Sequence, residues 1–185
     1  MRKEIEVKAK INNVAEIEEK ISALGVQFSA PLRQEDEIFI NFDIKTFGDF
    51  QSGINLLRIR KTNDESIFTI KQPQSNEFDS IEHETKISNP DEMREALKLM
   101  GYKSAVQVKK TRKTAKYKDF EICLDFVEDL GDFIEVEKIA GENADSGQIQ
   151  NELFEFLLNL GIRNENRVTQ GYDTLIFLKE AGKLN

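Results

Sequence analysis

The stretch MRKEIEVKAK (residues 1–10) decides the fold. From Glu4 to Lys8, charged and apolar residues alternate with a period of two, which is the pattern of a β-strand. One face of this strand would carry Glu4, Glu6 and Lys8, and the opposite face would be apolar. Such a strand either lies at the surface with one solvated face, or it faces a site that needs two carboxylates and an amine.

The composition limits the classes of protein and partner. The chain has 185 residues, of which 39% are hydrophobic and 32% charged, as expected for one soluble globular domain over residues 1–185. With 34 acidic and 26 basic residues the formal net charge is −8, which argues against nucleic acid or a membrane as partner. One cysteine and one histidine exclude a disulfide framework and a zinc cluster. Neither a membrane-length apolar run nor a secretory signal pattern is present, so we expect a cytoplasmic protein.

The order of the predicted elements favours an antiparallel sheet. Period-two alternation predicts strands at residues 2–11, 33–42, 54–61, 65–72, 79–87, 102–117, 119–128 and 133–139. Apolar spacing and capping residues predict helices at 12–25, 89–101, 145–160 and from about 169 to about 181. Residues 43–53 and 72–78 are predicted to be loops. Because tight turns rather than crossover helices join most strands, the predicted class is α+β, mainly antiparallel β.

The charged alternation of the first strand recurs along the chain. The charged strand faces carry the bases Lys8, Arg58, Arg60, Lys71, Lys110 and Arg112, and the acids Glu4, Glu6, Glu82, Glu84, Asp125, Glu135 and Glu137. If these faces point outward, the chain is an acid-rich sandwich with an apolar core. If they point inward, the sheet closes into a barrel with a charged lumen, and helices cover its apolar outer face.

The inward arrangement predicts a specific kind of ligand. Paired carboxylates bind hard cations such as Mg²⁺ or Mn²⁺, which prefer oxygen ligands. Arginine and lysine side chains together bind several phosphate oxygens, and arginine does so through forked contacts. A lumen that contains both sets is suited to a metal-bound polyphosphate.

These residues carry a resemblance to a known family. The pattern Glu4-x-Glu6-x-Lys8 matches the ExExK signature of the CYTH, or triphosphate tunnel metalloenzyme, superfamily. Further segments follow in the order of that family across nearly the whole chain: LRIR (57–60), TIK (69–71), ExE (82–84), VKKTR (108–112) and LDFVEDLGDFIEVE (124–137). The last segment looks most like the class IV adenylyl cyclases of this superfamily.

The resemblance implies a fold and a set of site residues. The implied fold is a closed eight-stranded antiparallel β-barrel, the triphosphate tunnel, with helices packed outside. The residues implied to hold Mg²⁺ or Mn²⁺, as two ions, are Glu4, Glu6, Asp125, Glu135 and Glu137. Those implied to bind the substrate are Lys8, Arg58, Arg60, Lys71, Glu82, Glu84, Lys110 and Arg112. Those expected to act in catalysis are Glu4, Glu6, Lys8, Lys110 and Arg112.

A few residues near these motifs depart from the family pattern or lie outside the predicted site. Ser80 departs from the family pattern, because members often have a basic residue at this position, and one phosphate contact is therefore in question. His83 alternates away from the face of Glu82 and Glu84 and is expected to be structural, whereas Lys109 and Lys113 lie opposite the face of Lys110 and Arg112 and are expected to be exposed. Cys123 is expected to be a packed residue, although its register places it on the face of Asp125.

The resemblance implies a metal-dependent enzyme that acts on a small triphosphate. The leading hypothesis is an adenylyl cyclase of the class IV type, which converts ATP to 3′,5′-cyclic AMP and pyrophosphate. A triphosphatase acting on thiamine triphosphate, inorganic triphosphate or a nucleoside triphosphate would use the same residues, with water as the nucleophile. A non-catalytic polyphosphate- or nucleotide-binding module and a plain acidic interaction domain are further alternatives. A homodimer is an expectation from the family.

Overall fold

The chain folds into nine strands and four α-helices, described by a computed structural model for residues 2–44, 47 and 50–184. In chain order, the strands are β1 (Arg2–Lys10), β2 (Leu32–Asn41), β3 (Leu56–Lys61), β4 (Ser66–Pro73), β5 (Asp79–Ile87), β6 (Tyr102–Tyr117), β7 (Phe120–Val127), β8 (Gly131–Gly141) and β9 (Arg167–Val168). The helices are α1 (Val14–Ala23), α2 (Pro90–Leu99), α3 (Ser146–Asn159) and α4 (Tyr172–Glu180). A short 3-10 turn (Asn164–Asn166) precedes β9.

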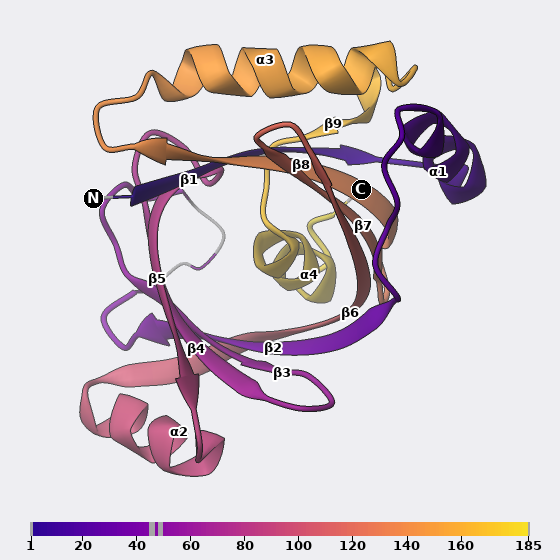
Figure 1. Cartoon of the computed structure of the whole chain (residues 1–185). Coiled ribbons are helices and arrows are strands. Elements are labelled where there is room, and N and C mark those ends of the chain that lie inside the picture. Colours follow the sequence, from indigo (N-terminus) through magenta and orange to yellow (C-terminus); the bar gives the residue numbers. More distant parts are fainter. Residues whose placement is uncertain (1, 45–46, 48–49, 185) are drawn as a thin grey trace.

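Eight of the strands form a closed ring (Figure 1). Their spatial order is β5-β4-β3-β2-β6-β7-β8-β1, and β1 pairs with β5 to close the sheet on itself. Every pairing in the ring is antiparallel. The prediction of a closed eight-stranded antiparallel barrel is confirmed, and the sandwich alternative is wrong.

The seam that closes the barrel consists of three short segments along one edge of β1. Residues 3–5 pair with β5. The Glu6 amide then donates to the Phe78 carbonyl at 2.9 Å, and Lys8 and Ala9 pair with β9. The opposite edge of β1 pairs with β8 along its whole length. β1 therefore takes its partners from the middle and the end of the chain.

Three helices cover the outside of the barrel, as predicted. Asn13, Asn89 and Asp145 each accept a hydrogen bond from a backbone amide of the first turn, and so begin α1, α2 and α3. α1 and α3 pack on the apolar outer faces of β1, β7 and β8, whereas α2 packs on β2 and β3 around the fully buried Leu97. The apolar half of the alternation thus faces helices, and the charged half faces the lumen.

The fourth helix lies in a different place from the three outer helices. Figure 1 shows α4 within the outline of the barrel. Its residues Tyr172, Leu175 and Ile176 pack against Val108 of β6 and Val127 of β7, which point inward. At one end of the barrel the inward positions are apolar instead of charged, and α4 fills that end.

Some predicted boundaries change. The last helix begins at Tyr172 and not near residue 169, because residues 167–168 pair with β1 as β9. The predicted loop at 43–53 lies partly outside the described residues, although Phe47 is described and meets Phe177 edge-on at 5.3 Å between ring centroids. None of the helices that the structure describes has both the length and the apolar character needed to cross a membrane.

Candidate active site

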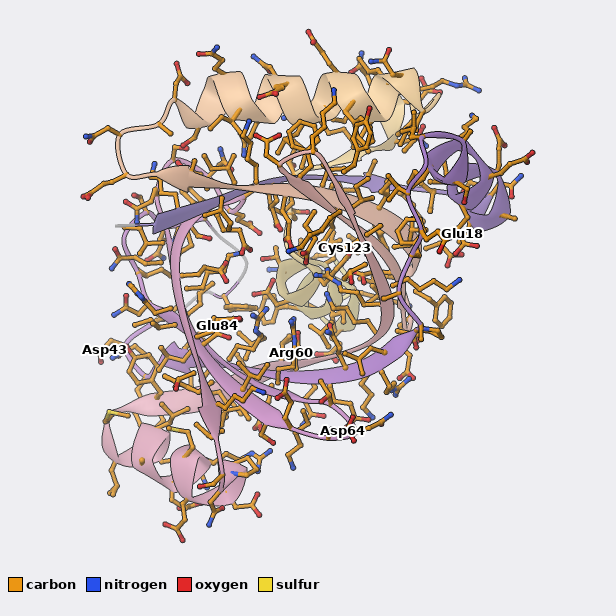
Figure 2. The ribbon with its side chains drawn as sticks, in the orientation of Figure 1. Glu18, Asp43, Arg60, Asp64, Glu84 and Cys123 are labelled. Carbon is orange, nitrogen blue, oxygen red and sulfur yellow. The ribbon has the colours of Figure 1, made fainter. Side chains whose placement is uncertain are left out.

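The charged strand faces line a cavity of about 610 Å³ inside the barrel. This volume is typical of sites for small ligands. In Figure 2, Arg60 and Cys123 point into the barrel, whereas Glu18 and Asp64 lie outside it. The predicted site residues that line the cavity are Glu4, Glu6, Lys8, Arg58, Arg60, Lys71, Glu82, Glu84, Lys110, Arg112, Glu135 and Glu137. The remaining one, Asp125, is 2% exposed and lies behind the bases that it binds.

Three of the five predicted metal ligands meet at one place in the wall. Carboxylate oxygens of Glu4, Glu6 and Glu137 all lie within 4.8 Å of one another. The register explains this meeting, because Glu6 of β1 stands directly opposite Glu137 of β8, and Glu4 follows on the same face of β1. Like charges placed directly opposite in a sheet destabilise it. The arrangement is therefore costly unless a cation neutralises it.

The pKa values of these three glutamates also show that their negative charge is unfavourable. Burial, with Glu82 as the next contributor, raises the pKa of Glu4 to about 7. Burial also raises the pKa of Glu6, and burial together with Glu4 raises the pKa of Glu137 well above its usual value. Three oxygen ligands whose negative charge is unfavourable fit a hard divalent cation, which would bind the charged form.

The bases of β3 are held by carboxylates on neighbouring strands. The Arg60 guanidinium donates two hydrogen bonds of 2.7 Å to the two oxygens of Asp36, which is buried. Burial would raise the pKa of Asp36, but Arg60, together with Arg58 and Lys110, holds it well below its usual value. Arg58 donates to Glu84 at 2.8 Å and to the Thr69 hydroxyl at 3.1 Å. Both guanidinium groups are thus oriented across the lumen before any ligand binds.

Lys71 and Glu82 form a second oriented pair, in which Lys71 Nζ lies 2.7 Å from Glu82 Oε1. The Ser80 hydroxyl donates to the same carboxylate at 2.9 Å. Burial would raise the pKa of Glu82, but Lys71 and then Arg58 lower it to about 2. Ser80, where the family often has a base, therefore supports the acid of this pair.

The remaining two predicted metal ligands bind bases. Asp125 accepts hydrogen bonds from Lys110 at 3.1 Å and from Arg112 at 2.7 Å. Glu135 is bound by Arg112 and lies 3.1 Å from Lys8 Nζ. Burial would raise the pKa of Glu135, but Arg112 and Lys8 hold it well below its usual value. The assignment of these two carboxylates as metal ligands stays a prediction, and in the structure they position three bases.

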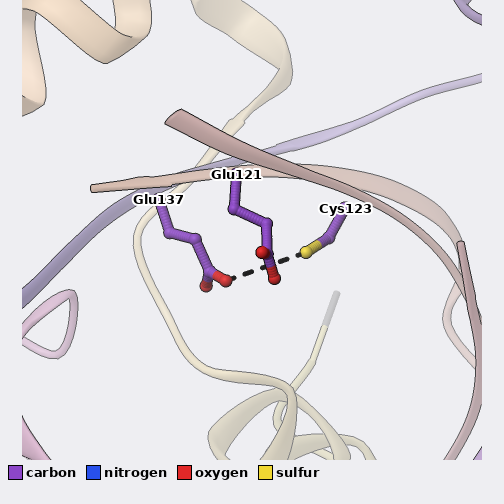
Figure 3. A group of neighbouring side chains, drawn as sticks. All are labelled: Glu121, Cys123 and Glu137. Carbon is purple, nitrogen blue, oxygen red and sulfur yellow. Dashed lines mark hydrogen bonds between the residues drawn. The ribbon is translucent and has the colours of Figure 1, made fainter. Parts of the chain in front are cut away.

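Cys123 lies where its register placed it, next to Glu121 and Glu137 (Figure 3). Its Sγ is 3.9 Å from a Glu137 oxygen, and the side chain is fully buried. Burial raises the pKa of the Cys123 thiol well above its usual value. The thiol is therefore a protonated, packed group, as expected for a structural cysteine. Lys109 is exposed, as predicted, and His83, which was expected to be structural, is exposed as well.

Comparison with known proteins gives the family. The sequence model of the CYTH domain matches residues 2–172. This chain belongs to the CYTH domain family. A relative from Methanocaldococcus jannaschii, provisionally named an adenylate cyclase, is 31% identical over 171 residues, covering 91% of this chain and 95% of the relative.

Solved structures share the CYTH fold. The PH1819 protein of Pyrococcus horikoshii is 29% identical and superposes with a TM-score of 0.77, covering 95% of this chain and 99% of that one. A Hippeastrum protein, provisionally named an adenylyl cyclase and described as having a dominant triphosphatase activity, superposes with a TM-score of 0.61. It is 20% identical, covers 100% of this chain and 98% of that one, and shows the likeness of fold alone.

The cavity residues that were not predicted as site residues include Gln34, Asp36, Glu77 and Tyr172. Asp36 orients Arg60, and Glu77 accepts hydrogen bonds from the Gly171 amide at 2.6 Å and the Thr174 hydroxyl at 3.2 Å, so it holds the first turn of α4. Gln34 and Tyr172 also line the cavity. Only the strand alternation of residues 33–42 could have indicated Gln34 and Asp36. The α4 residues could not be found, because the sequence does not show that α4 enters the barrel.

Proposed function

We propose that this protein is a metal-dependent enzyme acting on a triphosphate, and that it is an adenylyl cyclase converting ATP to 3′,5′-cyclic AMP and pyrophosphate. One observation carries the proposal. Three glutamates with unfavourable negative charge meet in the wall of a closed tunnel, and the other walls carry oriented arginines and lysines. Membership of the CYTH family and the name of the Methanocaldococcus relative support the same activity.

Glu4, Glu6 and Glu137 would hold the divalent cation, Mg²⁺ or Mn²⁺. When bound, such an ion acts as a Lewis acid that lowers the pKa of an attacking hydroxyl and stabilises charge on phosphate oxygens. Carboxylates outnumber bases among the residues that line the cavity, so a cation bound together with the triphosphate would add positive charge where the phosphate chain lies. We therefore propose that the triphosphate enters with a cation. A second ion, expected from the family, stays a prediction.

The bases would hold the phosphate chain. Arg58 and Arg60 reach into the lumen from β3, Lys71 from β4, and Lys110 and Arg112 from β6. Each is already oriented by a carboxylate, so little side-chain entropy is lost when a phosphate oxygen binds. Groups that are positioned before the reaction stabilise the charge that develops in the transition state, and this is usually the largest contribution to such catalysis.

In the proposed reaction, the ribose 3′-oxygen attacks the α-phosphorus in line with the departing pyrophosphate. A bond forms between O3′ and the α-phosphorus, and the bond from that phosphorus to the oxygen bridging to the β-phosphate breaks. The hydroxyl proton passes to solvent. No covalent intermediate with the protein is required, and the tunnel holds both reacting groups in one molecule of substrate.

A triphosphatase is the second candidate. The charged groups of the tunnel would bind the phosphate chain. The same groups would serve if water, instead of O3′, attacked a phosphorus atom. The triphosphatase activity described for the Hippeastrum protein, which has the same fold, favours keeping this candidate. A non-catalytic binding module explains the site less well, because capture of an anion by bases does not need the three clustered glutamates.

Product identification tests the proposal. The protein is incubated with ATP, inorganic triphosphate or thiamine triphosphate, each with Mg²⁺ or Mn²⁺, and the products are separated by ion-exchange chromatography. Cyclic AMP with pyrophosphate is expected. ADP or free phosphate would select the triphosphatase, and binding without turnover would select the binding module. Glu6→Gln should abolish turnover, whereas Glu155→Gln, on the exposed face of α3, should leave it unchanged.

A further inference from the structure

Two lysines differ from the other bases that line the cavity. Six of the eight bases each have a carboxylate partner, and these are Lys8, Arg58, Arg60, Lys71, Lys110 and Arg112. Among the residues that the structure describes, the side chains of Lys116 and Lys118 make neither an ion pair nor a hydrogen bond. Both residues are exposed. An anion can therefore reach their amines without displacing a carboxylate.

The two lysines lie at the open end of the tunnel. Strands β6 and β7 meet in a tight hairpin, in which Lys116 is close to the end of β6 and Lys118 lies in the turn. The fourth helix, α4, packs against the same two strands near their other end. A ligand that enters at the hairpin therefore passes Lys118 and Lys116 before it reaches Arg112 and Lys110.

Lys116 also lies in the same row of the barrel as the proposed cation site. It stands opposite Glu121 of β7, which stands opposite Glu137 of β8, and Glu137 stands opposite Glu6 of β1. Carboxylate oxygens of Glu121 and Glu137 lie within 4.8 Å of each other (Figure 3), and in the described part of the chain Glu121 makes no ion pair with Lys116. A cation-bound phosphate chain would thus meet a free amine in the row of its cation.

The place of Lys118 in the turn has no explanation in the packing of the fold. Its φ of 57° is left-handed, and tight hairpin turns normally use glycine, asparagine or aspartate in that conformation. Asp119, the next residue, lies 2.8 Å from Lys138 Nζ. The Lys118 amine lies 5.1 Å from the centroid of the Tyr117 ring, and such a contact is weak at an exposed site. A strained residue at a rim points to a role for its side chain outside the fold.

We propose that Lys116 and Lys118 form an entry site, which captures the anionic triphosphate at the mouth of the tunnel before the paired bases bind it. The proposal rests on the proposed function, in which a triphosphate occupies this tunnel. The net charge of −8 repels an anion, but salt screens charges that are more than about 10 Å away at 0.1 M. Two free amines at the rim therefore dominate the field that an arriving anion meets. Charges at a rim mainly raise the rate of association.

Three variants separate this role from folding and from overall charge. Lys116→Gln removes one rim charge and keeps a polar side chain. Lys118→Gly removes the other and suits the left-handed backbone, so the melting temperature should stay the same or rise. Lys109→Gln is the matched control, because Lys109 is exposed on the outward face of the same strand and the variant loses the same charge.

Stopped-flow fluorescence of the full chain tests the proposal. The probe is an ATP derivative whose ribose 3′-oxygen carries a fluorescent group and so cannot be cyclised, with Mg²⁺ or Mn²⁺. Lys116→Gln and Lys118→Gly should each lower the association rate constant about three- to tenfold at low salt. At about 1 M salt, where the Debye length is about 3 Å, the difference should shrink to about twofold or less. The dissociation rate constant should change by about twofold at most, and Lys109→Gln should match the unaltered protein.

Three results would overturn the proposal. Unchanged association in both rim variants would show that the lysines do not capture the substrate. Equal slowing by Lys109→Gln would show that overall charge acts, and not the rim. Faster dissociation with unchanged association would place the lysines in the bound complex instead of at entry. If neither the probe nor inorganic triphosphate bound to the unaltered protein in calorimetry, the proposed function itself would fail, and the entry site would fail with it.

Discussion

Replacing Glu4 by glutamine tests the cation site through protein stability. Burial, followed by the nearby Glu82 carboxylate, raises the pKa of Glu4 from 4.5 to about 7. The unfolded chain keeps the lower value, so between these two pH values the native protein holds a proton that the unfolded chain has lost. The free energy of unfolding of the metal-free protein therefore falls as the pH rises from about 4.5 to about 7.

The size of this effect follows from the two pKa values. The difference between 4.5 and about 7 corresponds to about 3 kcal/mol, since one pKa unit is about 1.4 kcal/mol. Glu4→Gln should therefore stabilise the metal-free protein at pH 8 by up to about 3 kcal/mol and should have no effect at pH 4.5. Lys71 keeps Glu82 as a partner at 2.7 Å, so the variant does not leave a buried amine alone.

The assay is urea unfolding followed by circular dichroism, at pH 4.5 and pH 8 in the presence of a chelator. In a chain of this length about 1 kcal/mol shifts the melting temperature by about 2–4 °C, so a thermal scan should show a rise of several degrees at pH 8. Added Mg²⁺ or Mn²⁺ should then stabilise the unaltered protein more than the variant. Glu155→Gln on α3 is the control. A Glu4→Gln protein that is less stable at pH 8, or that gains equally from the cation, would refute the reasoning.

Three further results are expected. Arg60→Met should lower the free energy of unfolding by about 3 kcal/mol, because it leaves the buried Asp36 without its bidentate partner. Urea unfolding measures this loss, and adding Asp36→Asn should recover part of it. Glu77→Ala should speed amide hydrogen exchange in the first turn of α4, because the Gly171 amide loses its acceptor, while exchange in α2 stays unchanged. Cys123 should resist an aromatic disulfide reagent in the native protein and react once urea unfolds it, since burial covers the thiol and raises its pKa; rapid native labelling would contradict the structure.

The sequence predicts much of the barrel because period-two alternation depends on local geometry. Glu4, Glu6 and Lys8 must share one face of any strand they form, and the structure keeps them on one face. Alternation alone does not say whether that face points inward. The ordered family motifs decided this question, and the helices on the outer face supply its physical reason.

The sequence could not predict which carboxylates pair with bases and which meet other carboxylates. Asp125 and Glu137 look equivalent in sequence, since both occupy the charged face of a late strand. Strand register separates them, because Asp125 stands opposite Arg112 whereas Glu137 stands opposite Glu6. Register depends on pairing between distant segments, which a single sequence does not show. The position of Tyr172 could not be predicted for a related reason, because it depends on the pairing of β9 with the distant strand β1.

The three-part seam along β1 also has a consequence for synthesis. β1 leaves the ribosome before its partners β5, β8 and β9, which end at residues 87, 141 and 168. Until the last of these emerges, the nascent chain presents an unpaired strand edge, which is a risk for aggregation. The charged side chains of Glu4, Glu6 and Lys8 discourage that edge from pairing with other chains. The residues proposed to bind the cation and the phosphate would thus also protect the unfinished barrel.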